Sequence, residues 1–208
     1  MPQLLDGLRL TVVLGIQSMI LSVVIGVIGA VSRQYGAFPL RIVAVAYVEL
    51  IRNTPLLVQI FVVFFTLPAI GLRLDPETAG LVALSANGGA YMTEIIRAGL
   101  VAIPKGQVEA AYALGLSGPQ ALRDVIGVPA LKIIYPALVS QCVVMLLNTS
   151  ICSQIAVNEL TATVNTIDSN TFRSFELYVL LVVVYVALSF LFGIAFRGFR
   201  KLAFRWEL

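Results

Sequence analysis

The stretch EAAYALGLSGPQALRDVIGVP, residues 109–129, decides how this chain is expected to fold. It lies between two long apolar runs, but Glu109, Arg123 and Asp124 make it too polar to cross a bilayer. Its alanine, leucine, valine and isoleucine residues nevertheless recur at helical spacing. The stretch is therefore expected to form short amphipathic helices that connect two membrane spans.

The composition of the whole chain supports a membrane setting. Of the 208 residues, 59% are hydrophobic and only 12% are charged, whereas a soluble domain carries about 25% charged residues. The mean hydropathy is +0.96. We therefore expect an all-α integral membrane protein, because a helix satisfies its own backbone hydrogen bonds in lipid.

Apolar segments long enough to span recur along the chain. A helix needs about 20 apolar residues to cross about 30 Å of hydrocarbon. We expect about five transmembrane helices, at Leu10–Val31, Val43–Pro68, Thr78–Ile103, Leu131–Ile155 and Leu177–Phe199. The residues between the last two, Val157–Phe175, are expected to form an external excursion with a short helix. The length suits a single membrane domain, residues 1–208, with its core at about 7–199.

The basic residues predict the orientation of these spans. Cytoplasmic loops carry an excess of Lys and Arg, and the basic residues fall mostly on one side of the predicted spans. The N-terminus is therefore expected outside and the C-terminus in the cytoplasm, with residues 104–129 as a cytoplasmic loop. The cytoplasmic group is Arg33, Arg41, Lys105, Arg123, Lys132, Arg197, Arg200, Lys201 and Arg205, and the external group is Arg9, Arg73 and Arg173.

The sequence offers little for catalysis or metal binding. It has no histidine, the commonest general base and metal ligand. Cys142 and Cys152 would lie about 15 Å apart along one helix, too far for a disulfide, and we expect both to be apolar-facing thiols. We therefore expect no catalytic residue and no metal site. The net charge of +3 needs no nucleic acid, because basic residues facing anionic lipid account for it.

The quoted stretch has the features of a helix–Gly–helix unit. Gln107–Leu116 contains strong helix formers, Gly115 is a plausible stop, and Ser117 is a plausible N-cap for a second helix that runs to Pro129. Small side chains at its start allow another surface to approach closely. The residues alone leave two interpretations open: a docking site for a cytoplasmic partner, or an ordinary interfacial loop.

A family resemblance favours the first interpretation. Glu109-Ala110-Ala111, three residues, Gly115, a hydrophobic pair and a proline resemble the EAA loop of ABC importer permeases (type I) of the polar amino-acid branch. Nearly the whole chain takes part in the resemblance. The other similar segments are GLRLTVVLGIQSMILSVVIGVIGAV (7–31), AYVELIRNTPLLVQ (46–59), SANGGAYMTEIIRAGLVAIPKGQVEAAYALGLS (85–117), NTS (148–150) and TFRSFELYVLLVVVYVALS (171–189).

The resemblance implies a permease subunit that moves polar amino acids across the bacterial inner membrane by alternating access. In this family the two short helices insert into a groove on an ATP-binding subunit, so Glu109, Ala110, Ala111, Gly115 and Leu116 would couple the two. Two permease subunits, identical or related, would sit on two ATPases, and an extracytoplasmic binding protein would deliver the amino acid. ATP and Mg²⁺ would bind to the partner, since this sequence has no G-x-x-x-x-G-K-[ST].

Two positions depart from the family pattern. The family usually has its loop-ending proline one position earlier, where Val128 stands, so Pro129 implies a different exit angle for the second helix. The family also often has a lysine where Leu147 stands, just before the Asn-Thr-Ser motif.

Charged and polar residues inside the predicted spans are candidates for a substrate pathway or gate. Glu49 and Arg52, and likewise Glu94 and Arg97, are three residues apart on one helix face. Each pair either neutralises itself near the cytoplasmic interface or contacts a zwitterionic substrate. The neutral groups are expected either to face a cavity or to bond between helices. The candidate set is Glu94, Arg97, Tyr91, Asn87, Gln59 and Asn148.

Two other functions remain open on sequence. A self-contained secondary transporter or channel would couple transport within this chain, and its cytoplasmic loop would be incidental. A membrane scaffold would need no substrate site. The cytoplasmic loop distinguishes the three, since only the importer requires it to meet an ATPase.

Overall fold

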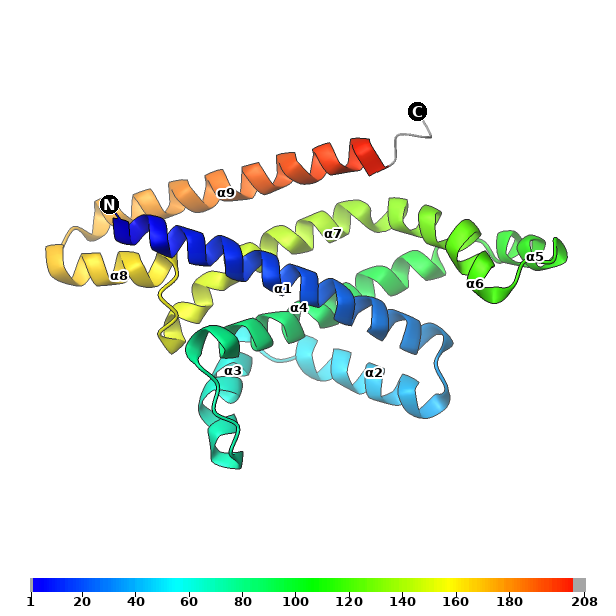
Figure 1. Cartoon of the computed structure of the whole chain (residues 1–208), viewed down its shortest axis with the longest axis horizontal. Coiled ribbons are helices and arrows are strands. Elements are labelled where there is room, and N and C mark those ends of the chain that lie inside the picture. The colour runs from blue at the N-terminus through cyan, green and yellow to red at the C-terminus, as the bar shows by residue number, and fades with distance from the viewer. Residues whose placement is uncertain (1, 204–208) are drawn as a thin grey trace. The chain divides into compact units, whose positions relative to one another are not determined.

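The computed structural model describes residues 2–203, and helices occupy almost all of them, with no strand in this range. The all-α prediction is confirmed. In chain order the helices are α1 (Pro2–Tyr35), α2 (Phe38–Arg52), α3 (Leu56–Phe61), η1 (Val62–Thr66), η2 (Leu67–Ile70), α4 (Pro76–Val101), α5 (Lys105–Ala113), α6 (Gly118–Gln120), η3 (Ala121–Gly127), α7 (Val128–Asn148), η4 (Thr149–Ile155), α8 (Leu160–Thr171) and α9 (Ser174–Ala203), as Figure 1 shows.

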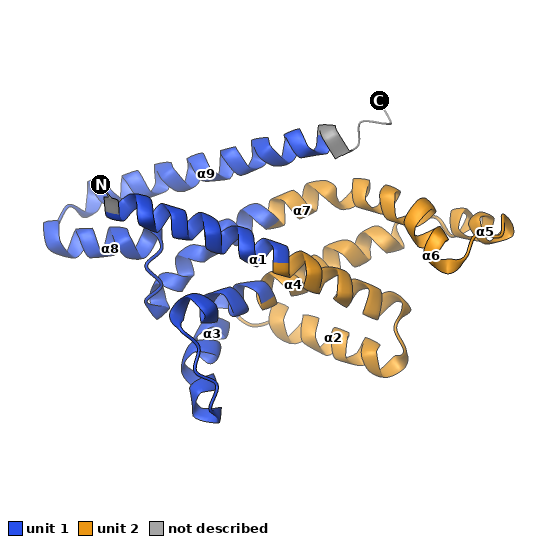
Figure 2. Ribbon diagram, in the orientation of Figure 1, with its two compact units in different colours: residues 1–20, 55–85, 142–208 blue, residues 21–54, 86–141 orange. Residues whose placement is uncertain are grey.

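The chain divides into two compact units, which Figure 2 distinguishes by colour. Unit 1 holds residues 1–20, 55–85 and 142–208, and unit 2 holds residues 21–54 and 86–141. Three helices, α1, α4 and α7, contribute residues to both. The candidate coupling loop and the charged pairs belong to unit 2.

Unit 2 is built on a close approach of α1 to α4. A Cβ atom added at Gly26 would lie 2.5 Å from the Cβ of Met92 and 3.0 Å from its carbonyl carbon. One added at Gly29 would lie 2.4 Å from the Thr93 hydroxyl oxygen. Small residues of this kind let membrane helices pack backbone to backbone. The glycines of the first span are therefore packing positions, fitted to α4.

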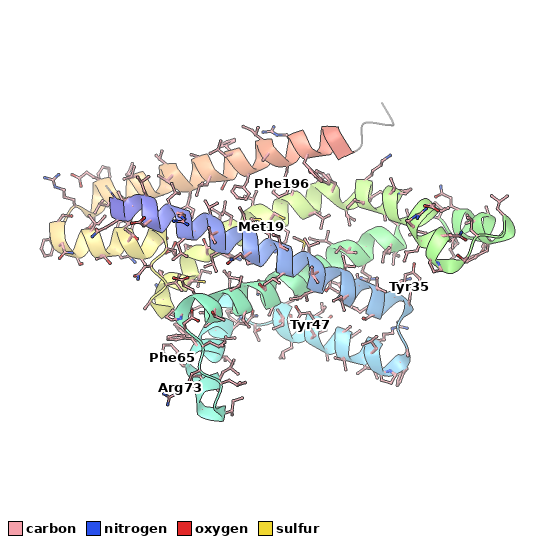
Figure 3. All side chains as sticks on the ribbon, viewed as in Figure 1. Met19, Tyr35, Tyr47, Phe65, Arg73 and Phe196 are labelled. Atoms are coloured by element: carbon pink, nitrogen blue, oxygen red, sulfur yellow. The ribbon has the colours of Figure 1, made fainter. Side chains whose placement is uncertain are left out.

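The α2 helix joins the same packing. Tyr47, labelled in Figure 3, donates its hydroxyl proton to the carbonyl of Ala86 at the start of the unit 2 part of α4. A Cβ at Gly89 would meet both Ile25 of α1 and the Tyr47 hydroxyl, at 2.5 and 2.9 Å. Gly89 is thus the point at which α1, α2 and α4 meet.

Unit 1 has its own apolar core. Leu14, Ile60, Leu84, Cys152 and Ile155 are each at most 2% exposed, and they pack together from α1, α3, α4 and η4. Cys142 and Cys152 are both free and buried, as predicted. The predicted helix within residues 157–175 is α8, which packs on α9 through Leu160, Val164 and Leu181.

The helices agree in part with the five predicted spans. By length and composition, residues 3–35, 118–155 and 174–200 form three candidate spans, and α2 with residues 56–70 forms a fourth as a broken pair. The 26 residues of α4 would extend for about 39 Å at 1.5 Å per residue. Much of α4 is buried in protein, which explains why its composition is less apolar. Five spans and their orientation stay predictions.

The predicted second span, Val43–Pro68, is wrong as one continuous helix. The helix α2 ends at Arg52, and α3 begins at Leu56. Pro55 has no N–H to donate and disfavours the helical conformation at Thr54. The side chain of Thr54 instead bonds back to the carbonyl of Leu50 at 2.9 Å. The proline therefore explains why the segment is broken between Arg52 and Leu56.

The second loop helix also differs from the prediction, because it does not end at Pro129. Residues 118–127 form one α turn and a π-helical segment, η3, which runs directly into α7. A π-helical turn accommodates an extra residue within a helix. Pro129 lacks an N–H, and it lies two residues after the π-helical segment, where the regular i→i−4 hydrogen bonding is already interrupted. The loop is thus joined to the fourth predicted span without a break.

We predict that Gly26→Ala destabilises the protein, because its methyl group would enter the space that Met92 fills. Overpacking of this kind costs about 1–3 kcal/mol, which should lower the melting temperature of the detergent-purified protein by several degrees. Gly193→Ala in α9 is the matched control, since a Cβ there meets nothing within 4 Å. Equal melting temperatures for the two variants would refute the close approach of α1 to α4.

Candidate coupling loop and intramembrane charge centre

The first helix of the loop carries the EAA residues on α5. Its face is divided: Ala111 is only 2% exposed and anchors the helix, whereas Glu109 and Ala110 are exposed. Ala110 has no side chain beyond its methyl group, so a partner can come close to the backbone there. The arrangement presents a small residue and a carboxylate side by side to the surroundings.

Gly115 ends this helix in a left-handed conformation, with φ of +81°. The N–H of Gly115 donates to the carbonyl of Tyr112 at 2.9 Å, and the N–H of Leu116 donates to that of Ala111 at 3.1 Å. These two bonds form a Schellman motif, which satisfies carbonyls at a helix end. The predicted stop is confirmed, although α5 itself ends at Ala113.

The second loop helix begins at the predicted N-cap. The backbone N–H of Ser117 donates to the side-chain oxygen of Gln120 at 2.9 Å, as in a capping box. A small apolar cluster of Ile103, Ile126 and Ala130 then holds the loop to the end of α4 and the start of α7. The loop is therefore a formed structure attached to two membrane helices.

We predict that Gly115→Ala loosens the loop, because an L-residue in the left-handed conformation costs about 1–2 kcal/mol. A cost of that size multiplies the locally open population by about 5–30, so limited proteolysis within residues 109–120 should accelerate accordingly. Gly106→Ala is the control, since Gly106 has ordinary φ and nothing within 4 Å of its Cβ position. Identical cleavage rates would contradict the role assigned to Gly115.

The second feature of unit 2 is a charge centre around Glu94. The predicted pair with Arg97 is confirmed, with Nη2 and Oε2 3.0 Å apart. Glu94 also forms an ion pair with Arg33 of α1. The side chains of Arg33, Glu94 and Arg97 are 16%, 19% and 33% exposed. One carboxylate therefore links two arginines from two helices.

Of the two alternatives left open for Glu49 and Arg52, the structure does not show mutual neutralisation by an ion pair. Glu49 accepts a hydrogen bond from the side chain of Asn53 at 3.2 Å, and within residues 2–203 no ion pair joins Glu49 to Arg52. The guanidinium of Arg52 lies instead over the ring of Tyr91, 5.3 Å from its centroid. Asn53 is the residue directly after the end of α2, and its side-chain amide is the partner of the Glu49 carboxylate.

The remaining candidate pathway residues lie in different units. Asn87, Tyr91 and Glu94 follow one another at helical spacing on α4 and all belong to unit 2, with Asn87 buried. Gln59 and Asn148 belong to unit 1, and both are half-buried. The structure thus places Asn87, Tyr91, Glu94 and Arg97 on one helix, α4.

Sequence reasoning missed the part played by Arg33, which it treated as an interfacial cation. The sequence did contain a signal for this ion pair. The first and third predicted spans cross the membrane in the same direction, so their C-terminal ends are expected on the same side. Arg33 stands two residues before the end of α1, and Glu94 stands seven residues before the end of α4. The flexible Arg side chain covers the difference in depth.

Sequence reasoning also missed a buried carboxylate in unit 1. Glu159 is 0% exposed and caps α8 by accepting from the N–H of Ala162 at 2.8 Å. It accepts a second bond from the Tyr185 hydroxyl at 2.9 Å, and Thr11 lies 3.4 Å away. The N–H of Leu160 donates in turn to Thr11. Burial raises the pKa of Glu159, while its hydrogen bonds oppose that rise.

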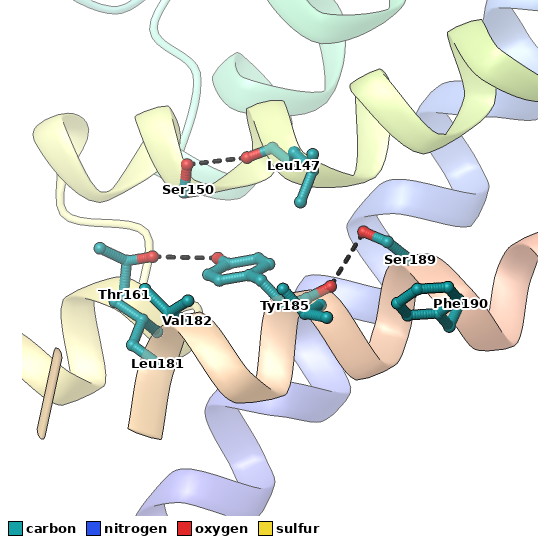
Figure 4. Close-up of a pocket in the computed structure, with 9 residues that line it drawn as sticks. Leu147, Ser150, Thr161, Leu181, Val182, Tyr185, Ser189 and Phe190 are labelled. Atoms are coloured by element: carbon teal, nitrogen blue, oxygen red, sulfur yellow. Dashed lines mark hydrogen bonds between the residues drawn. The ribbon is translucent and has the colours of Figure 1, made fainter. Parts of the chain in front are cut away.

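A groove of about 610 Å³ lies beside this network (Figure 4). Its hydroxyl groups bond within the protein: Tyr185 with Thr161 at 2.9 Å, Ser189 with the carbonyl of Tyr185, and Ser150 with the carbonyl of Leu147. The rest of the lining is aliphatic or aromatic. Leu147, which stands where the family often has lysine, gives the groove an apolar wall.

We predict that Tyr185→Phe destabilises the protein through Glu159. An ionised carboxylate that loses a buried donor costs about 1–3 kcal/mol. Because the folded-state pKa is raised, the cost is largest above that pKa and shrinks as pH falls and Glu159 becomes protonated. The melting temperature should therefore fall more at about pH 8 than at about pH 5. A deficit independent of pH would contradict this account, and Tyr178→Phe on the same helix, where Tyr178 bonds the exposed Asn165, is the control.

The chain is similar to known proteins of membrane transport. A family model described as "binding-protein-dependent transport system inner membrane component" matches residues 22–204. The L-cystine transport system permease protein TcyB of Bacillus subtilis (strain 168) is 41% identical over 159 residues, 76% of this chain and 68% of that protein. The glutamine transport system permease protein GlnP of Escherichia coli (strain K12) is 34% identical over 202 residues, 96% of this chain and 92% of that protein.

Solved structures give the same result. A chain of the "crystal structure of an amino acid ABC transporter with histidines" superposes with a TM-score of 0.88 at 36% identity, covering 96% of this chain and 94% of that chain. A chain of the MetNI methionine ABC transporter in an inward facing conformation gives a TM-score of 0.79 at 20% identity, which shows the shared fold.

The fold and the loop therefore define a multi-pass helical subunit of a membrane transporter. More particularly, the chain belongs to the family of binding-protein-dependent transport system inner membrane components, the permeases of ABC importers. It is a protein of the inner membrane, and membership implies an ATP-binding subunit and a binding protein as partners.

Proposed function

We propose that this permease carries polar amino acids inward by alternating access, driven by ATP that binds with Mg²⁺ to a separate subunit. The amino-acid cargo is supported by the relatives, which are named for cystine, glutamine and arginine. On this proposal the chain itself performs no chemistry. It pairs through its spans with a second permease, identical or related, because one copy has too few helices to enclose a pathway.

The observation that carries the proposal is the architecture of the loop in residues 104–129. Its exposed Glu109 and Ala110 stand beside the buried Ala111, and the Gly115 turn separates two helices. Its ends join α4 and α7, both of which have the length of membrane spans. A partner that moves Glu109, Ala110, Ala111, Gly115 and Leu116 would therefore move membrane helices.

We further propose that Asn87, Tyr91, Glu94 and Arg97, with Gln59 and Asn148, line the substrate pathway or its gate. Ionisable groups inside membrane proteins generally mark such pathways. Tyr91, Glu94 and Arg97 are all partly exposed, so they can meet water or substrate.

The test is uptake by the assembled transporter. The chain is co-expressed with its ATP-binding subunit, a second permease and the binding protein, reconstituted into vesicles, and offered a panel of labelled amino acids. ATP-dependent uptake of at least one polar amino acid is expected. Uptake by this chain alone, driven by an ion gradient without ATP, would instead establish a secondary transporter.

We predict that Glu109→Lys abolishes this uptake while membrane insertion stays normal. The substitution replaces the only acidic side chain of α5 with a basic one, on the exposed face that Glu109 and Ala110 would present to a partner. Glu176→Lys is the matched control, because Glu176 is also exposed and lies in the first turn of α9. Normal uptake by Glu109→Lys at normal expression would count heavily against the docking role.

A further inference from the structure

The charge centre of unit 2 has an excess of positive charge. Glu94 is paired with Arg33 and Arg97, and Arg52 also acts on Glu94 electrostatically. Two guanidinium groups are thus paired with one carboxylate, and a third acts on it without forming an ion pair. Glu49, the one acidic residue of α2, bonds Asn53 and forms no ion pair with Arg52 within the described residues.

This excess leaves the exposed Arg52 without a carboxylate partner among the described residues. Charges in low dielectric require partners, because their desolvation penalty is not otherwise offset. Arg33 and Arg97 satisfy this need through Glu94. Arg52 has the face of Tyr91, which offers a cation–π attraction but accepts none of its N–H groups.

The position of Arg52 is suited to binding an anionic group of a molecule that passes through the transporter. It is the last residue of α2, where the chain leaves the helix at a break between two halves of a predicted span. In transporters, broken helices of this kind commonly form substrate sites near the middle of the membrane. The Arg52 side chain is exposed, and the Tyr91 ring restricts the directions in which its planar fork can point.

We propose that Arg52, seated on Tyr91, binds the α-carboxylate of the amino acid in transit. Arginine and carboxylate form a bidentate pair with two parallel N–H···O bonds. The carboxylate is common to every amino acid, so the contact sets the class of substrate and leaves the choice of side chain to other residues. Arg33 has a positioning role, because it holds Glu94 and so keeps that carboxylate away from Arg52. The proposal rests on the amino-acid cargo proposed above.

The first experiment measures uptake of labelled L-glutamine by the assembled transporter in vesicles, with varied amounts of loaded binding protein. Arg52→Gln should lower kcat about tenfold or more, since a charged hydrogen-bonded contact is worth more than 1.4 kcal/mol. The KM for the binding protein should stay the same, because that protein docks outside. Arg52→Lys should recover part of the rate. Arg41→Gln, at the other end of α2 and exposed, should behave as wild type.

The second experiment separates carboxylate binding from a structural role. The melting temperature of the purified assembly is measured with L-glutamine, with L-glutaminamide, which lacks the carboxylate, and with inorganic phosphate. L-glutamine alone should raise it in the wild type, and Arg52→Gln should lose that rise. Tyr91→Leu, which removes the aromatic ring that Arg52 stacks on, should lose most of the rise in melting temperature.

Several results would overturn the inference. These are a wild-type kcat in Arg52→Gln, an equal rise with L-glutaminamide or phosphate, or no rise with L-glutamine in the wild type. A failure of the cargo proposal is seen separately, as wild-type vesicles that take up no amino acid of the panel, and the inference would fall with it.

Discussion

The close approach of α1 to α4 is the constraint on which unit 2 depends. Gly26 and Gly29 remove the side chains that would otherwise hold the two backbones apart, and Met92 and Thr93 fill the space that they leave. The ion pair of Arg33 with Glu94 joins the same two helices. In lipid the hydrophobic effect does little to bring helices together, so shape and polar contacts must determine the packing. The charge centre is therefore a product of backbone fit.

The helix α4 connects the two functional features of unit 2. Glu94 lies seven residues before its end, and α5 starts four residues beyond that end. A buried cluster around Ile103 joins α4, the loop and α7. The Gly115 turn, which closes α5 with two backbone hydrogen bonds, keeps the loop compact. The connection between the loop and the ion pairs is short and packed, so a displacement of the loop would be transmitted to the ion pairs.

The sequence predicted much of this arrangement, because the chemistry concerned is local. Hydropathy reports spans directly, Gly115 and Ser117 identify a helix end and a helix start, and residues three apart on a helix meet as Glu94 and Arg97 do. The contacts that the sequence did not predict are made between helices. Arg33 meets Glu94 across 61 positions, and Thr11 lies beside Glu159 across 148. Arg52 was assigned the nearest carboxylate in sequence, but packing placed it on Tyr91. Two prolines also act differently from the prediction: Pro55 lies where the helix breaks, whereas Pro129 follows a π-helical segment inside a continuous helix.

The buried carboxylate of Glu159 has a consequence for biogenesis. Its partners come from the beginning and the end of the chain, with Thr11 on α1 and Tyr185 on α9. During synthesis the first helix leaves the ribosome long before the last, and until α9 arrives Glu159 lacks one of its donors. A nascent chain truncated before α9 would hold an undersatisfied carboxylate and an uncovered face of α8. The hydrogen bonds of Glu159 are therefore complete only once the last helix of the chain has packed against α8.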